Sequence, residues 1–503
     1  MDVPEEKVNP DWVASRLSNP QCESEQLQAS GTIQDFGALF QFDAVSRRIG
    51  HASANIEAYI GIPALALLGS GIETFDWLRE IDFPASPALA GKRLTIANIA
   101  DAGQGRVDAV CIHGDGVVTV EIEPVPVVDA ALPDHRFMLG LMAAPTDQAD
   151  LASYRHHLAA GIAAISGYAR VMIYQFMEDW SGEVVTHVGD DGMESYLGLR
   201  FPATDIPRIA RELYLLNPCR MIPDSAAVPV PVLGLTAAPP DLTWSDLRSV
   251  SPAHLDYLAA MGVRASLSIP IRLFGKLWGL VVCHHLTPRL LRVEQRGRCL
   301  ALASQFALGM KWYLSSRRLQ VADGLNWRLD AVLSSLSASA NPIDGLQANQ
   351  QALLLLMSAQ GVALLSDNAV AMAGTGLSLS ELTQLDAWFV GSIAGGVFMT
   401  RQRSTDIPLA CDPSSPVCGV MAVKLRSSRS GWLRFYWFRP AEVVEVVWAG
   451  NPDQPVSDAD PATPSPRRSF RRWSETMVDC SRPWSAEDKF AALRFSVRGA
   501  HWL

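Results

Sequence analysis

The chain has 503 residues, of which 49% are hydrophobic and 19% charged, and its net charge is -10. Length and composition predict about three domains with packed cores and argue against a largely disordered chain. The acidic balance argues against nucleic-acid and anionic membrane surfaces as partners, because binding either needs clustered basic side chains. The 8 cysteines include no C-x-x-C pair, so neither a disulfide scaffold nor a metal site is expected.

The N-terminus and the hydropathy pattern bear on location. Residues 1–6 are acidic and lack the apolar run of a secretory signal peptide. Charged residues such as Arg264, Arg272 and Lys276 interrupt the apolar stretches, and none reaches the roughly 18 residues of a membrane-spanning helix. We therefore expect a cytoplasmic protein with no membrane segment.

The first part of the chain, residues 1–130, is predicted to form a small α+β domain behind a polar, irregular N-terminal segment. A strand is expected at 38–42, where apolar residues dominate. A second is expected at 117–128, where Pro124 and Pro126 interrupt the pattern because proline cannot donate to a sheet.

The second part, residues 131–315, has a clearer pattern. An Ala- and Leu-rich helix is expected at 148–165, and a strand buried on both faces at 170–176. Two apolar runs within 266–283 meet at Gly275, and this arrangement predicts a hairpin in which glycine supplies the turn.

A Pro- and Ala-rich stretch and a long helix stand out in the same part of the chain. Residues 223–244 are predicted to form a long loop, and such loops in compact domains are usually functional. From 292 to about 336 the pattern is helical, with Leu302, Phe306 and Met310 spaced by four. This helix either links domains, pairs with a second subunit, or packs one face on its own domain.

The third part, residues 316–503, mixes helical and strand patterns, including an aromatic run at 435–438. Prolines and arginines break the regularity at 451–472, and a short helix is expected at 486–495. No catalytic domain is recognisable before the end of the sequence, so we do not expect this chain to be an enzyme.

A group of polar residues follows the string FPATDIP at 201–207. Two prolines around Asp205 predict a rigid turn whose carbonyls face something other than their own chain. Arginine forks and hydroxyls downstream are suited to binding carboxylates, although a scatter of solvated surface residues is the competing interpretation. The candidates are Arg211, Tyr214, Arg220, Arg248, Ser251, His254, Tyr257, Ser266, Ser268 and His284.

Several separated strings resemble the photosensory core of the bacteriophytochromes. They are FPATDIP with RELY and NPCR, then SPAHLDYLAAMGV, ASLS and LWGLVVCHHLTP. Upstream, Cys22 and the string SGTIQ resemble the attachment segment of that family, and downstream WAG and PRRSF resemble its tongue. The resemblance covers nearly the whole chain in the right order.

The resemblance implies an α+β fold of three tandem domains with long linker helices. These are an N-terminal segment with a PAS domain (1–130), a bilin-binding GAF domain (131–315), and a PHY domain (316–503) whose tongue spans about 448–484. It also implies a figure-of-eight knot, with Ile33 threaded through the 223–244 loop. Knots are otherwise almost absent from proteins.

The family implies a cofactor, biliverdin, a linear tetrapyrrole held as a covalent thioether at Cys22. Asp205 resembles the residue whose main-chain carbonyl meets the pyrrole N–H groups, His254 the imidazole beside the inner rings, and His284 the donor to the ring D carbonyl. The implied propionate contacts are Tyr214, Arg220, Arg248, Ser266 and Ser268. The implied ring D surroundings and remaining contacts are Tyr168, Tyr174, Leu199, Phe201, Ile206, Ser251 and Tyr257.

The family also implies a light-driven switch. Ring D rotates after isomerisation of the ring C–D bridge, the pairing of Asp205 with Arg467 is exchanged, and the tongue motif that holds Arg467 and Ser469 refolds. The expected partners are the bilin, a second copy of the chain, and a histidine kinase, another output module or a response regulator, with neither nucleic acid nor membrane.

The sequence departs from the family pattern at two places. Residues 34–37 are QDFG where the family usually has QPHG, which puts the local path of the threaded segment in question. Leu199 stands where the family usually has a polar residue near ring D. Members with a far-red-absorbing dark state tend to have glutamine there, so Leu199 favours a red-absorbing dark state.

Two other functions compete with the photoreceptor. In an enzyme, Cys22 would be a nucleophile with His254 or His284 as its base, but this leaves the arginines without a role. In a PAS/GAF sensor of a small ligand or haem, His284 or His285 would be a haem ligand.

Overall fold

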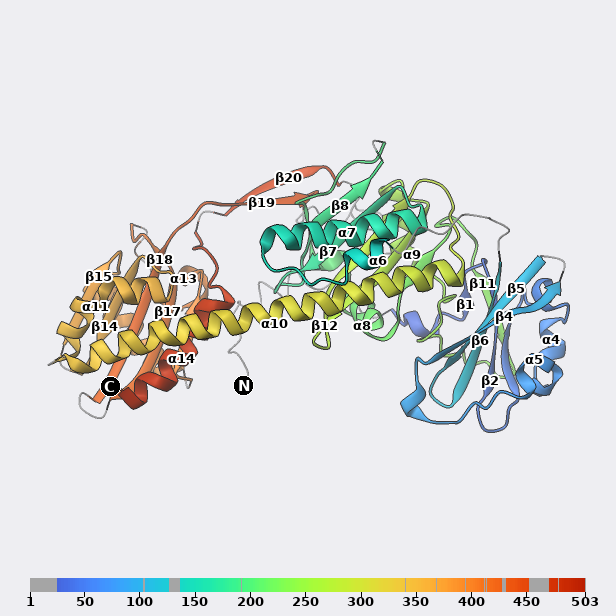
Figure 1. The fold of residues 1–503 in the computed structure, drawn as a ribbon, viewed down its shortest axis with the longest axis horizontal. Coiled ribbons are helices and arrows are strands. Elements are labelled where there is room, and N and C mark those ends of the chain that lie inside the picture. The colour runs from blue at the N-terminus through green and yellow to red at the C-terminus, as the bar shows by residue number, and fades with distance from the viewer. Residues whose placement is uncertain are drawn as a thin grey trace. The chain divides into compact units, whose positions relative to one another are not determined.

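The structure is a computed structural model, and two compact units make up the chain (Figure 1). One comprises the described residues of 17–313 and 448–473, and the other those of 314–447 and 474–503. Residues described are 25–102, 105–125, 136–190, 192–339, 341–367, 369–393, 395–410, 412, 414–427, 431–451, 470–477 and 479–502.

The first unit begins with a seven-stranded sheet of order β1-β11-β3-β2-β6-β5-β4. Its strands are β1 (Thr32–Ile33), β2 (Ala38–Asp43), β3 (Ile49–Ser53), β4 (Arg93–Ala102), β5 (Gly105–His113), β6 (Val117–Pro124) and β11 (Val230–Gly234). The short helices α3 (Glu57–Ile60), α4 (Ala64–Leu67) and α5 (Asp76–Arg79) follow β3. Phe40 stacks on Phe75 at 5.0 Å between ring centroids, so the core lies between the sheet and this helical segment.

The N-terminal segment lies between β11, which is inside the predicted loop, and residues 247–248, which follow that loop. On one side Thr32 and Ile33 pair with Pro231 and Val230 of β11. On the other, Ile33 bridges Arg248, and the Gln34 amide donates to the Leu247 carbonyl at 2.7 Å. Ile33 is fully buried. The stretch 223–244 is thus not loop throughout: β11 forms inside it, because the apolar run at 230–234 finds edges to pair with in β1 and β3.

The second sheet of this unit runs β10-β12-β13-β7-β8-β9. Its strands are β7 (Arg170–Phe176), β8 (Gly182–Gly189), β9 (Arg200–Phe201), β10 (Arg220–Ile222), β12 (Ala265–Leu273) and β13 (Lys276–His285). The predicted hairpin forms at Phe274-Gly275, where both residues have positive φ (52° and 78°), as a tight turn that matches strand twist requires.

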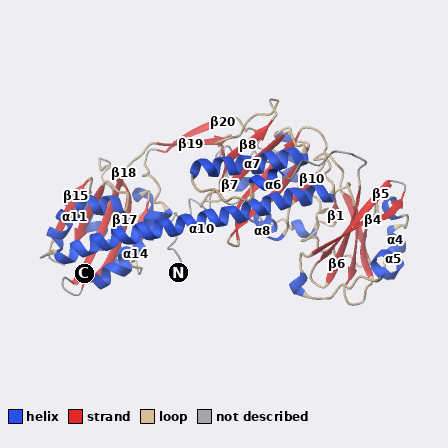
Figure 2. Ribbon diagram, viewed as in Figure 1, coloured by secondary structure: helices blue, strands red, loops and turns tan. Residues whose placement is uncertain are grey.

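Helices flank this sheet (Figure 2). They are α6 (Arg136–Gly140), α7 (Gln148–Ser166), α8 (Arg208–Leu216), α9 (Pro252–Ala260) and the 46-residue α10 (Val293–Ala338). Tyr154 of α7 stacks on Phe306 of α10 at 5.1 Å. Trp448 in β19 (Val444–Ala449) pairs in parallel with Arg200, and β20 (Arg472–Met477) follows later in the chain.

The second unit contains a five-stranded sheet of order β15-β14-β18-β17-β16. Its elements are α11 (Pro342–Leu356), β14 (Gly361–Leu365), β15 (Val370–Gly374), α12 (Leu379–Ser392), β16 (Val397–Thr400), α13 (Arg403–Asp406), β17 (Val417–Ser427), β18 (Gly431–Pro440) and α14 (Ala486–Trp502). The aromatic run in β18 alternates: Phe435 and Trp437 pack on Phe495 of α14, whereas Tyr436 packs on Phe389 of α12. The sheet therefore has a core on each face.

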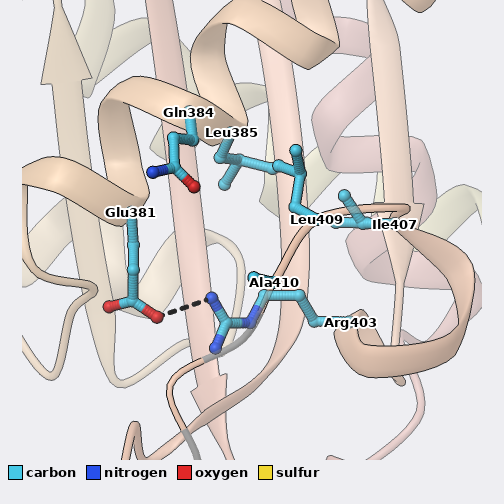
Figure 3. A pocket seen from close by; sticks show the side chains of 7 residues that line it. All are labelled: Glu381, Gln384, Leu385, Arg403, Ile407, Leu409 and Ala410. Carbon is cyan, nitrogen blue, oxygen red and sulfur yellow. Dashed lines mark hydrogen bonds and ion pairs between the residues drawn. The ribbon is translucent and has the colours of Figure 1, made fainter.

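A small pocket opens beside α12 and α13 (Figure 3). Glu381 and Arg403 point toward each other in it, and their charged groups lie 3.0 Å apart. None of the helices in the described part of the chain is long and apolar enough to cross a bilayer.

A buried ion pair ties the first sheet to α10. Arg296 donates two hydrogen bonds to the Glu123 carboxylate, at 2.8 and 2.6 Å. Both side chains are almost fully buried, at 5% and 4% exposure. An exposed ion pair on the same helix offers a contrast, since Arg298 pairs with Glu294 at 2.9 Å in solvent.

The two pairs give a matched prediction. Arg296→Ala leaves the Glu123 charge buried without its partner, so it should lower the free energy of unfolding of this unit by about 3–5 kcal/mol. Arg298→Ala removes an exposed i,i+4 pair and should cost no more than about 0.5 kcal/mol. Urea denaturation of both variants measures the difference. Equal midpoints would contradict the assigned role of the buried pair.

Candidate functional site

One face of the second sheet gathers polar residues that are far apart in sequence. Arg220 pairs with Ser268, Ser266 with His284, and His284 with Arg170 across four neighbouring strands. Residues two apart on a strand share a face, so these side chains line one side of the sheet. The sequence reasoning proposed all of them except Arg170.

Two arginines of this site have backbone carbonyls as their acceptors. Arg220 donates to the carbonyls of Asp246 (3.1 Å), Arg248 and Ser249 (2.9 Å). Arg248 donates to the carbonyls of Leu242 and Thr243, both at 3.1 Å. Within the described residues neither forms an ion pair with a carboxylate.

The electrostatics of these arginines follow from that arrangement. Burial lowers the pKa of Arg220, and it lowers the pKa of Arg248 to about 9, with the Arg220 guanidinium acting in the same direction. Burial raises the pKa of Tyr214, while the Ser268 hydroxyl and the two guanidinium groups oppose the shift. Two cations thus lie close together beside a neutral phenol, and an anion would relieve their repulsion.

Helix α9 brings a second group into the site. Burial, and then the Arg220 charge, lowers the pKa of His254 to about 4, so this imidazole is neutral at pH 7. His254 stacks on Tyr257 at 6.0 Å between centroids. The Tyr257 hydroxyl donates to Asp205 Oδ2 at 3.0 Å, and its ring meets Phe470 edge-on at 5.0 Å.

His284 forms the end of the site on β13. Its side chain is 5% exposed, and its Nδ1 lies 2.8 Å from Arg170 Nη2. Burial, followed by the charge of Arg170, holds the pKa of His284 well below its usual range. Arg170 in turn lies over the Tyr196 ring at 4.2 Å.

An aromatic cluster adjoins this histidine–arginine pair. Tyr174 contacts Phe176 at 5.2 Å and Phe201 at 6.0 Å between centroids, and Tyr196 meets Phe201 edge-on at 5.7 Å. A Cβ at Gly182 would lie 1.8 Å from the Tyr174 ring, so only glycine leaves room for it there. Leu199 lies in the same segment and is 5% exposed.

Two predicted residues have other surroundings. Tyr168 is buried but lies with His285, Cys283 and Cys299 and their neighbours rather than with His284, so the structure does not bring it into the group. The Ile206 carbonyl accepts from Arg211 at 2.6 Å, so this carbonyl of the turn faces its own chain.

Four further predicted residues are Ser251, Cys22, Arg467 and Ser469. Ser251, at the start of α9, donates to Glu25 Oε2 at 2.8 Å. Cys22, Arg467 and Ser469 lie outside the described residues. The sequence reasoning missed Arg170 and Tyr196. The sequence did contain a signal for Arg170. It is a charged residue at the start of a strand that is buried on both faces, and it lies on the same face of that strand as Tyr174.

The loop that carries Arg248 is anchored to the first sheet by an acid. Glu121, with no exposed surface, accepts from the Ser245 hydroxyl at 2.5 Å and the Leu247 amide at 3.2 Å. Burial, and next the charge of Asp246, raises the pKa of Glu121 to about 8. Asp246 itself pairs with Arg93 at 2.5 Å.

Comparison with known proteins supplies the family. The profiles of the PAS fold, the GAF domain and the phytochrome region match residues 22–125, 151–309 and 328–498. A crystal structure of a bacteriophytochrome from R. palustris is 30% identical, with a TM-score of 0.78 over 95% of this chain and 98% of that one. The chain belongs to the phytochrome family.

Further relatives agree with this assignment. The phytochrome photosensory core module of Stigmatella aurantiaca is 29% identical, with a TM-score of 0.79 over 96% of this chain and 98% of that one. Cyanobacterial phytochrome B of Nostoc sp. is 31% identical over 95% of this chain and 65% of that protein. The bacteriophytochrome of Pseudomonas aeruginosa is 32% identical over 93% and 64%. The chain thus spans just under two thirds of these two curated relatives.

The predicted α+β fold with PAS, GAF and PHY regions is confirmed by these matches. The domain limits 1–130, 131–315 and 316–503, the tongue limits, the knot and the individual site residues stay predictions.

The anchoring glutamate gives a prediction on pH. The pKa of Glu121 is about 8 in the folded protein, against an ordinary value of 4.5. Between these two pH values the folded protein holds a proton on this carboxyl group and the unfolded chain does not. Stability from this group is therefore full below pH 4.5 and is lost as the pH rises toward 8. Glu121→Gln should remove that loss, so the variant should gain stability over the parent at pH 8 relative to pH 5.

Thermal melts at pH 5, 6, 7 and 8 measure the effect, with Glu57→Gln, an exposed glutamate of the same domain, as the control. Parallel pH profiles for the parent and Glu121→Gln would rule out the assigned titration.

Proposed function

We propose that this chain is the photosensory module of a red/far-red photoreceptor that binds biliverdin covalently. The observation that carries the proposal is the pair Arg220 and Arg248, the first partly buried and the second 6% exposed, whose guanidinium groups both donate to backbone carbonyls. Isolated charges are costly to bury, so this pairing is suited to a ligand with two carboxylates. Biliverdin has two propionates, and the family implies this ligand.

The residues present fit the group along its length. The propionates would be held by Arg220, Ser266 and Ser268 from β10 and β12, by Tyr214 from α8, and by Arg248 from the loop before α9. The neutral imidazole of His254 would lie beside the inner rings, and the Asp205 main chain would accept from their N–H groups. Cys22 would form the thioether.

The far end of the ligand would meet His284 and the aromatic cluster. Tyr174, Phe201 and Leu199 supply an apolar surface next to that histidine. When bound, the bilin supplies absorption of red light and isomerisation about its ring C–D bridge. The protein's part is to hold the propionate end and to let hydrogen bonds at the His284 end change.

We propose that the signal leaves through the tongue and α10. Asp205, held by Tyr257, would exchange its contacts with Arg467 and Ser469 between the two states. A photocycle and tongue refolding that stay normal in Arg467→Ala would contradict this part. The signal would pass to a histidine kinase, another output module or a response regulator.

A second copy of the chain is proposed as a partner of α10. Within the first unit Leu308 and Trp312 expose 60% and 68% of their surface, and within the second unit Leu319 and Trp327 expose 66% and 75%. Such exposed aromatic and aliphatic side chains on a helix favour a partner surface. Light scattering that returns a monomer at every concentration would contradict dimerisation.

Haem sensing is the weaker alternative. The Nδ1 atom of His284 already contacts Arg170, and the Nδ1 atom of His285 accepts from the Ala169 amide at 3.1 Å. Among the described residues, neither imidazole has the acceptor on one nitrogen that usually orients a metal-binding histidine.

Reconstitution with biliverdin tests the proposal. The chain should absorb red light, change its spectrum reversibly under red and far-red light, and give a zinc-dependent fluorescent band on a denaturing gel. Cys22→Ser should lose the band, whereas Cys480→Ser, which removes a buried cysteine of the other unit, should keep it. A colourless protein, or a Soret band that light does not change, would overturn the proposal.

A further inference from the structure

We propose that Arg170 is a positioning residue that fixes the tautomer of His284, with the proton on Nε2, so that this imidazole is a permanent N–H donor toward the bound ligand. The identity of that ligand rests on the proposed function above. The tautomer itself does not, because it follows from contacts within the protein.

Arg170 can only donate in its contact with His284. A guanidinium has five N–H donors and no acceptor. Arg170 Nη2 lies 2.8 Å from His284 Nδ1, so Nδ1 must be the acceptor in this contact. In a neutral imidazole the other nitrogen then holds the proton. His284 therefore keeps its N–H on Nε2.

Arg170 is itself held in place. Its side chain is 1% exposed, its Nη1 donates to the Glu194 carbonyl at 3.0 Å, and it lies over the Tyr196 ring at 4.2 Å. The charge of this guanidinium group is at the same time poorly compensated. Its Nε has no partner among the described residues, and it forms no ion pair with any of them.

A buried arginine without a carboxylate is a weak contributor to stability. Its contact with an ionisable side chain of the binding site offers a functional reason for its presence. The contact also fixes the imidazole plane, since β7 and β13 hold Arg170 and His284 opposite each other in register.

The charges around the pair keep His284 neutral. Arg170 from β7 and His254 from α9 face it, and burial together with Arg170 lowers its pKa. Arg170 in turn faces Tyr196, Glu194 and Tyr257, and its charge also lowers the pKa of His187. Removing the Arg170 charge should release the constraint on the tautomer and raise the pKa of His284 part of the way, because burial, the larger cause of its lowered pKa, stays in place.

The first experiment uses the full chain without bilin, labelled with 15N-histidine, at pH 7. Magic-angle-spinning NMR should give His284, assigned by its loss in His284→Gln, a protonated Nε2 and an unprotonated Nδ1. Arg170→Met should shift it toward a mixture of tautomers or the cation, and Arg170→Lys, which keeps a donor, should retain the parent pattern. A parent His284 with its proton on Nδ1, or an unchanged pattern in Arg170→Met, would overturn the inference.

A matched control separates this effect from loss of a buried arginine in general. Arg155 donates to Gln175 at 3.4 Å and lies over Trp278 at 5.9 Å, and it has no contact with His284. Arg155→Met should leave the His284 signals unchanged. If Arg155→Met shifts them as Arg170→Met does, the positioning role is contradicted.

The second experiment uses the protein with biliverdin bound. The pH at which the absorption spectrum changes as His284 titrates should be higher in Arg170→Met than in the parent, because the Arg170 charge that helps to lower the pKa of His284 is removed. In His284→Gln the further change Arg170→Met should add no pH dependence. Full pH dependence persisting in the double variant would contradict the inference. If no bilin binds, the proposed function fails while the NMR result stands.

Discussion

Much of the candidate site depends on the burial of guanidinium groups without carboxylates to offset them. Arg220, Arg248 and Arg170 use backbone carbonyls, an imidazole nitrogen or an aromatic face as partners. Water would solvate these cations better than such partners do, so the fold keeps them inside at a cost. A ligand that is anionic at one end and offers a hydrogen-bond acceptor at the other would recover part of that cost.

The first sheet supports the site from behind. Glu121 of this sheet holds the Ser245–Leu247 backbone rather than an arginine of the site, and Arg93 of β4 pairs with Asp246 of the loop. The N-terminal segment fills the space between β11 and 247–249, and the Gln34 side chain donates to the carbonyls of Met221 and Arg248. The loop that presents Arg248 is therefore fixed from two directions. This arrangement supports the proposed threading of Ile33.

The sequence predicted some features of this structure and could not predict others. Periodicity was enough for α7, β7 and the β12–β13 hairpin, because their patterns are local. It failed for β11, whose five residues become a strand only through partners far away in the sequence, in β1 and β3. The resemblance to the family named most of the polar set. It did not name Arg170, because only the sheet register places that charge against the His284 ring nitrogen.

Calorimetric or spectroscopic titration with biliverdin and with its dimethyl ester measures how much the ligand's negative charge contributes to binding. The ester keeps the shape of the ligand but removes the negative charge that Arg220 and Arg248 should receive. Hydrogen bonds to charged groups contribute about 1.5–3 kcal/mol, so the account predicts that Cys22→Ser binds the diacid at least tenfold more tightly than the ester. Adding Arg220→Gln and Arg248→Gln should abolish that preference. Equal affinity for acid and ester before the arginines are replaced would contradict the account.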